Sequence, residues 1–127
     1  MRTDFSGRWL ANLDESVFVS RTPRRLTAEI TQSPDRLHVE MHVSFEGSDD
    51  SRMVFHASIV DGDEVRSGSV ALARWMGSDL VVETHFESGG QEVALRERWL
   101  LSGDGARLTM VHKNDVLAGQ TVVFERQ

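Results

Sequence analysis

The feature that most constrains this chain is an alternation of apolar and polar residues with a period of two, which runs through most of its 127 residues. Gly, Asp, Asn or Pro bounds each alternating segment, and this pattern is typical of antiparallel strands with one buried face. The nine predicted strands are 5–13, 26–33, 36–45, 52–60, 69–76, 79–88, 91–102, 106–113 and 119–126. The connector 14–25 alone has room for a turn of helix.

Four short turns predict which residues face one another, because a two-residue hairpin loop sets the register of the strands that it joins. The turns are Pro34-Asp35, Gly77-Ser78, Gly89-Gly90 and Asp104-Gly105. Each of them places apolar residues together on one face. The predicted facing pairs are Leu37 and Gln32, Val39 and Ile30, Met41 and Ala28, Val43 and Leu26, Trp75 and Leu80, Ala73 and Val82, Phe86 and Val93, Thr84 and Leu95, Val82 and Glu97, Leu101 and Leu108, Trp99 and Met110, and Glu97 and His112.

A sheet of this many strands twists and must close or split into two layers, and consecutive hairpins favour closure. We therefore predict one all-β domain over residues 1–127. Its architecture is a single antiparallel up-and-down β-barrel of about eight to ten strands, with one short helical or irregular connector after the first strand. Antiparallel closure needs an even strand number, so either residues 64–67 add a short strand or one predicted segment is not separate.

Charge and composition narrow the classes of partner. The formal net charge is -6, which repels nucleic-acid phosphates and anionic membranes. There is no cysteine, and no apolar run has the length of a signal peptide core or a membrane span. We expect a cytoplasmic monomer or weak homodimer that needs no cofactor and binds neither nucleic acid nor membranes. A secreted protein whose signal peptide had been removed would have the same sequence, so this alternative to a cytoplasmic location stays open.

The segment Phe5-Ser6-Gly7-Arg8-Trp9 resembles the opening Gly-x-Trp of lipocalins and fatty-acid-binding proteins, the calycin group of ligand-binding barrels. Residues 99–105 and 119–126 look like the last strands of small bacterial lipocalin-like domains. In the calycin pattern a basic residue of the last strand packs over the first tryptophan and closes one barrel end. The resemblance assigns these two structural roles to Arg126 and Trp9, and it implies that a small apolar ligand binds inside the barrel.

Two features depart from the family. The connector is too short for the two helices that cover fatty-acid-binding proteins, and only Gln127 follows Arg126, so the Arg-x-Tyr at the end of their last strand is absent. Capture of a carboxylate in that manner is therefore in doubt. The connector also carries Arg21, Arg24 and Arg25, which either steer an anionic ligand or belong to a solvated loop.

Glu97 is the clearest exception to the apolar inner face, because Leu95 and Trp99 share that face. A lone carboxylate there is costly to keep charged, so it needs a raised pKa or a partner. The register supplies His112 opposite, and Gln120 is a neighbour on the following strand. The pair is either a structural pair near the barrel rim, a handle that orients a ligand, or the general acid and base of an enzyme such as an isomerase or cyclase.

Small residues on the inner face predict a pocket. Ala71, Ala73 and Thr84 leave a void unless a neighbour fills it. The side chains expected to line this pocket, besides the polar pair, are Trp75, Phe55, Phe86, Trp99 and Met110. In the alternative interpretation, Trp75 and Trp99 fill the interior and the barrel has no small-molecule site.

The histidines His38, His42, His56 and His85 are predicted on the outer face. We expect His42 to lie opposite His56, at a separation where two imidazoles can share a metal ion. Protein zinc sites take three or four ligands, and no third ligand is evident. The sequence therefore predicts solvated surface histidines and no metal site.

Overall fold

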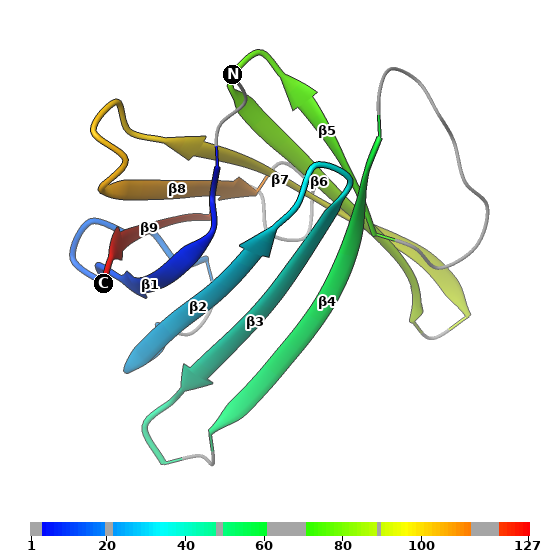
Figure 1. The fold of residues 1–127 in the computed structure, drawn as a ribbon. Coiled ribbons are helices and arrows are strands. Elements are labelled where there is room, and N and C mark those ends of the chain that lie inside the picture. The colour runs from blue at the N-terminus through cyan, green and yellow to red at the C-terminus, as the bar shows by residue number, and fades with distance from the viewer. Residues whose placement is uncertain (1–3, 20–21, 48–49, 61–70, 89, 113–119) are drawn as a thin grey trace.

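The computed structural model describes residues 4–19, 22–47, 50–60, 71–88, 90–112 and 120–127 (Figure 1). One sheet of nine strands closes on itself, and each strand pairs with the next in sequence. The strands are β1 (Gly7–Ala11), β2 (Arg25–Gln32), β3 (Arg36–Ser44), β4 (Ser51–Val60), β5 (Ala71–Met76), β6 (Asp79–Ser88), β7 (Gln91–Leu101), β8 (Arg107–His112) and β9 (Thr121–Arg126). The described ranges contain no helix, and hence none that could cross a membrane.

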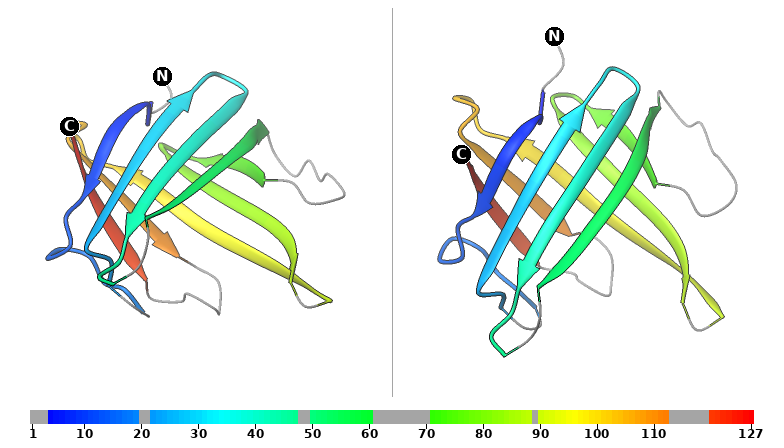
Figure 2. Two further views of the ribbon diagram at one scale, coloured as in Figure 1. Left: turned by 90° about the horizontal axis from the view of Figure 1, so that it is seen from below. Right: turned by 60° about the horizontal axis from the view of Figure 1, so that its bottom comes forward.

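The barrel closes between its first and last strands, where Trp9 of β1 lies opposite Arg126 of β9 (Figure 2). Each of the nine predicted segments corresponds to one of these strands, and the bounds agree to within two residues. The prediction of a purely antiparallel barrel is wrong, because β4 and β5 run parallel from the pair Ala57 and Ala71 to the pair Val60 and Arg74. A ring of strands closes only with an even number of antiparallel pairs, so nine strands require a parallel pair. The suggested strand 64–67 lies outside the described residues.

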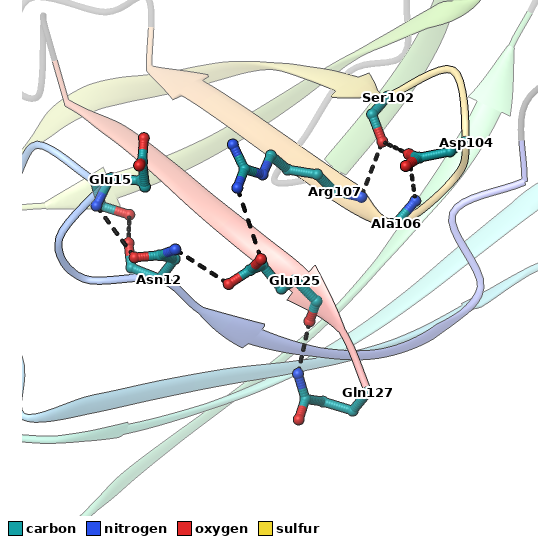
Figure 3. Close-up of polar contacts among 9 residues, drawn as sticks. Asn12, Glu15, Ser102, Asp104, Ala106, Arg107, Glu125 and Gln127 are labelled. Carbon is teal, nitrogen blue, oxygen red and sulfur yellow. Dashed lines mark hydrogen bonds and ion pairs between the residues drawn. The ribbon is translucent and has the colours of Figure 1, made fainter.

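All four predicted hairpin registers are confirmed, at β2–β3, β5–β6, β6–β7 and β7–β8. Three of the turns need glycine, since Gly77, Gly90 and Gly105 have φ angles of 65°, 81° and 73°. In the last turn, Asp104 accepts hydrogen bonds from the Ser102 hydroxyl and the Ala106 backbone N–H (Figure 3). These bonds lower the pKa of Asp104 and fix the turn that sets the β7–β8 register.

The connector after β1 is irregular over its described part, and the short helical turn that the sequence allowed is not formed. Asn12 follows the last residue of β1, and its side-chain oxygen accepts a hydrogen bond from the Glu15 backbone N–H, as Figure 3 shows. The Ser16 hydroxyl donates to the Asn12 carbonyl and accepts from the Val123 backbone N–H at 2.8 Å. Val17 then makes an isolated bridge to Thr121. Side-chain and backbone bonds to β9 thus replace the bonds that a helix would make.

The aromatic side chains of Phe5, Trp9 and Trp75 fill one end of the barrel. Together with Arg126, which lies over Trp9, they form what we call the closed end. Phe5 and Trp9 are fully buried. The Phe5 ring stacks on Trp75 at 6.2 Å and meets Trp99 edge-on at 5.6 Å. The Trp9 indole Nε1 donates to the Phe5 carbonyl at 3.0 Å, so its polar atom is satisfied inside the core.

Arg126 covers this end from the last strand. Its guanidinium carbon lies 4.3 Å from the centroid of the Trp9 ring, which is the contact that the sequence predicted. Its Nη1 donates to the Ser6 carbonyl and its Nε to the Gly105 carbonyl, both at 2.8 Å. Gly7 is required beside it, because φ is +141° and a Cβ there would lie 2.5 Å from Nη1 of Arg126. The arginine therefore ties β9 to the segment before β1.

Candidate functional site

An inward-facing polar pair lies where β7 and β8 stop pairing. Glu97 and His112 form the last pair of this ladder, as predicted, and β7 continues beside β6 alone (Figure 2). Strand alternation places Glu97 on the same face as Trp99, and the register sets it opposite Val82. Both of these apolar neighbours are fully buried. The backbone itself therefore turns the carboxylate toward the interior.

The carboxylate and the imidazole are in direct contact. Glu97 Oε2 lies 3.4 Å from His112 Nε2, and the two side chains keep only 16% and 12% of their accessible surface. The His112 backbone N–H donates to the Gln120 carbonyl at 2.9 Å. This bond holds the last residue of β8 beside the residue that precedes β9, and so fixes where the imidazole is placed.

Burial moves the two pKa values in opposite directions. It raises the pKa of Glu97 from 4.5 to about 7, because the charged carboxylate loses hydration. It lowers the pKa of His112 from its ordinary 6.5, and the Gln120 backbone acts in the opposite direction. Near pH 7 Glu97 is therefore partly protonated beside an imidazole that is mostly neutral. In such a pair the carboxylic acid can donate a proton and the imidazole can accept one.

Two buried nitrogens on the inner face of β7 and β8 lack hydrogen-bond partners among the described residues. They are Nε1 of Trp99 and Nδ1 of His112. Trp99 is fully buried, and an indole N–H is a donor only. Leaving a buried donor unpaired costs about 1–3 kcal/mol. A molecule that supplied an acceptor here would remove that cost.

Gln120, the third predicted polar residue, turns its amide elsewhere. Its side-chain Oε1 accepts from the Val19 backbone N–H at 3.4 Å, in the connector. Its backbone carbonyl, as described above, holds the end of β8. The structure therefore brings Gln120 next to His112 through the backbone, while its amide oxygen is engaged with the connector.

Several predicted pocket residues belong to the apolar core. Ala73, Trp99 and Met110 are fully buried members of one cluster, and half-buried Trp75 packs against it. The backbone pairing of Ala71 with Thr84 is confirmed. The predicted residues whose side chains lie outside the described part of the structure are Phe55, Ala71, Thr84, His85 and Phe86. A pocket lined by these residues stays a prediction.

The sequence did not reveal that part of the inner face is exposed at the ends of β3 and β4 that adjoin their turn. Met53 lies opposite Met41, which packs against the core, yet Met53 is 57% exposed. At the other end of the same two strands, Leu37 and Ala57 face each other and are fully buried. We call the end with Glu97, His112, Met41 and Met53 the polar end.

An open hollow of about 380 Å³ lies beside the polar end, between the connector and the β3–β4 turn. Thr22, Pro23, Arg24 and Glu46 line it. The Arg24 backbone N–H donates to the Ser44 carbonyl at 2.7 Å, which fixes this part of the connector to the end of β3. Arg24, predicted as part of a basic cluster, thus lies at a rim of the barrel, with the acidic Glu46 in the same hollow.

The predicted histidine pairing is wrong. His42 lies opposite Arg52, and His56 instead lies opposite His38, with their Nδ1 atoms 3.1 Å apart. The pairs differ by four residues, an even shift, so the strand faces are kept and only the partners change. The turn is centred earlier in the chain than the prediction assumed, because the last pair before it is Val43 with Ser51. No group of three or more metal-ligating side chains occurs among the residues that the structure describes.

The comparisons with known proteins leave the site to be interpreted from its own geometry. No protein-family model matches this sequence, and no curated protein matches it. What the structure shows is a closed all-β barrel with an aromatic closed end and a polar end. The function is therefore argued from the contacts of Glu97, His112 and Trp99.

Proposed function

We propose that this protein is a lipocalin-like, calycin-type barrel that binds a small apolar molecule in its interior, with Glu97 and His112 orienting the polar group of the ligand. The observation that carries the proposal is the carboxylate–imidazole pair, at 3.4 Å, turned toward an otherwise apolar interior. A purely structural pair would satisfy its own polar atoms. Here His112 Nδ1 remains unpaired among the described residues, and so does Nε1 of Trp99, two residues from Glu97 along β7.

The difference between the two ends supports the same function. Arg126 and Trp9 cover the closed end, in the arrangement that the Gly-x-Trp resemblance implies. At the polar end, the inward-facing Met53 is exposed to solvent beside Met41. Methionine side chains are flexible and adapt to apolar ligands of different shape. A ligand would enter past these methionines and meet the polar pair.

The test is a binding titration with Nile red, an uncharged apolar dye that carries a carbonyl. We expect saturable binding of one dye per chain, with blue-shifted emission. Glu97→Gln and His112→Ala should each weaken it by about tenfold, the loss of roughly one good hydrogen bond. Glu29→Gln is the matched control, because Glu29 forms an exposed ion pair with Arg8 on the outer face.

Native mass spectrometry of the protein purified from its own host adds a second arm to this test. A retained apolar molecule that is lost in the Glu97→Gln variant supports the proposal. No saturable dye binding, together with no retained molecule, would show that the barrel is filled and acts through its surface.

An enzyme is the second candidate, and the raised pKa of Glu97 beside an imidazole favours it. A carboxyl group that titrates near pH 7 next to an imidazole suits proton transfer on a bound apolar substrate, as in an isomerase or cyclase. The probe reaction is exchange of the α-protons of a straight-chain ketone in heavy water, followed by NMR. Glu97→Gln would lower the exchange rate far more than the affinity if the pair is catalytic. No acceleration over buffer by the unmodified protein leaves binding as the function.

A further inference from the structure

The distribution of positive charge around the barrel bears on what the interior can hold. Ion pairs with acidic partners hold five arginines on the outer face of the sheet; one of them is drawn in Figure 3. The pairs are Arg8 with Glu29, Arg52 with Glu40, Arg96 with Glu83, Arg98 with Asp79 and Arg107 with Glu125. These side chains are directed to solvent and to one another, so they do not reach a ligand in the interior.

Arg126 is engaged at the closed end. It covers Trp9 there and donates to the carbonyls of Ser6 and Gly105. At the polar end, the described inward-facing residues include the acid Glu97 and no lysine or arginine. Among the described residues, therefore, Glu97 brings a potential negative charge to the interior, and no inward-facing lysine or arginine is present to balance a second anion.

The unpaired polar atoms indicate which polar group of a ligand this site can bind. Trp99 Nε1 can only donate a hydrogen bond. Trp99 lies on the inner face of β7, two residues from Glu97. His112 faces Glu97 with Nε2 and leaves Nδ1 free. An oxygen acceptor on the ligand would complete the bond to the indole and, in the tautomer that protonates Nδ1, the bond to the imidazole as well.

We infer that the ligand is an uncharged apolar molecule with a carbonyl or hydroxyl oxygen, held by Trp99 Nε1 and His112, and that fatty acids and similar anions are rejected by Glu97. This inference rests on the proposed function. A carboxylate near Glu97 would lose its hydration and meet a like charge in a medium of low dielectric constant. A ketone or alcohol loses little hydration and gains the indole hydrogen bond.

The test compares four straight-chain probes of equal length: a ketone, an alcohol, a carboxylic acid and an amine. Their affinities are measured by displacement of Nile red and, for direct binding, by calorimetry at about pH 8, where the acid probe is ionised and Glu97 largely so. We expect the ketone and alcohol to bind at least about tenfold more tightly than the acid. Glu97→Gln should raise the affinity for the acid and so reduce the difference in affinity between the acid and the uncharged probes. The Glu29→Gln control should leave this difference unchanged.

The outcomes separate the inference from the proposed function. Equal or tighter binding of the acid overturns the inference but keeps the binding function, and a loss of acid binding in Arg24→Ala would then place the carboxylate at the hollow on the rim. Tightest binding of the amine also overturns it, because Glu97 would then serve as the counter-ion of a cation. If calorimetry detects none of the four probes and Nile red does not bind, the proposed function fails, and the inference fails with it.

Discussion

The closed end and the polar end are built from the same sheet and the same alternation of residues, yet their inward side chains differ in burial and in hydrogen bonding. At the closed end, the Trp9 indole is buried and bonded to the Phe5 carbonyl. At the polar end, an inward carboxylate meets an imidazole, and the inward Met53 is 57% exposed. The comparison shows that one end of this barrel can maintain the fold while the other keeps polar atoms available for binding.

The largest expected effect tests whether stability is concentrated at the closed end. Trp9→Ala should lower the free energy of unfolding by about 3–5 kcal/mol, because a fully buried indole is lost and a cavity remains. Met53→Ala, an inward position at the polar end, should cost less than about 1 kcal/mol because it is already exposed. Urea denaturation measures both values. Similar losses at the two ends would remove the contrast.

The next effect is the dependence of stability on pH. In the unfolded chain Glu97 loses its proton near pH 4.5, whereas in the folded protein it keeps the proton up to about pH 7. Between these values the folded state binds more protons, so the contribution of Glu97 to stability is full below pH 4.5 and falls as the pH rises through about 7, by about 3 kcal/mol in all. Glu97→Gln should remove this fall, as followed by urea denaturation across the pH range.

His112 contributes with the opposite sign. Its pKa is lowered in the folded protein, so the unfolded state binds more protons as the pH falls below 6.5, and stability is lost on the acid side. His112→Ala should therefore flatten the acid side of the profile. If the wild-type profile had the same shape as that of Glu97→Gln between about pH 4.5 and 7, burial would not be acting on this carboxyl.

Arg126 provides a smaller test of the closed end. Arg126→Ala should lower stability by about 1–2 kcal/mol, since it removes the contact with the Trp9 ring and two hydrogen bonds to backbone carbonyls. Nile red affinity should not change, because the dye is expected at the polar end. Arg107→Ala is the matched control, with one exposed ion pair to Glu125. Loss of dye binding at unchanged melting temperature would make Arg126 a ligand contact.

The smallest expected effect is the coupling between the two members of the polar pair. Glu97→Gln and His112→Ala should be non-additive in stability by about 1 kcal/mol, because removing one partner leaves the other buried and unpaired. A double-mutant cycle measured by denaturation gives this value. Additive losses would mean that the 3.4 Å contact carries no energy of its own.

The strand registers could be predicted from the sequence because both of their determinants are local. A period of two fixes which residues share a face, and two-residue turns fix their partners, so Glu97 and His112 were placed together correctly. The predicted partner of His56 was wrong because it depends on where the turn between β3 and β4 is centred, and this longer connection has no two-residue turn motif to fix it. The parallel β4–β5 pair follows from closing nine strands, a property of the whole ring.

The character of the site was only partly predictable. Glu97 could be predicted as a site residue because it is an acid on an otherwise apolar strand face. The Asp104-Gly105 turn then placed His112 opposite it. The exposure of Met53 and the unpaired Nε1 of Trp99 depend on how the barrel closes around them, because the same residue types are buried or bonded at the closed end. Sequence periodicity assigns a residue to a face, but it does not tell which end of that face is covered.

The binding of a ligand at the polar end is tested most directly by NMR, by following the indole N–H signals of Trp9 and Trp99 while the straight-chain ketone is added. Trp9 is already bonded to the Phe5 carbonyl, and Trp99 has no partner among the described residues. The account predicts that the Trp99 signal moves downfield with a saturable dependence on ketone, while the Trp9 signal stays in place. A fixed Trp99 signal under conditions where the ketone binds, or a shift of Trp9 alone, would contradict the assignment of the ligand to the polar end.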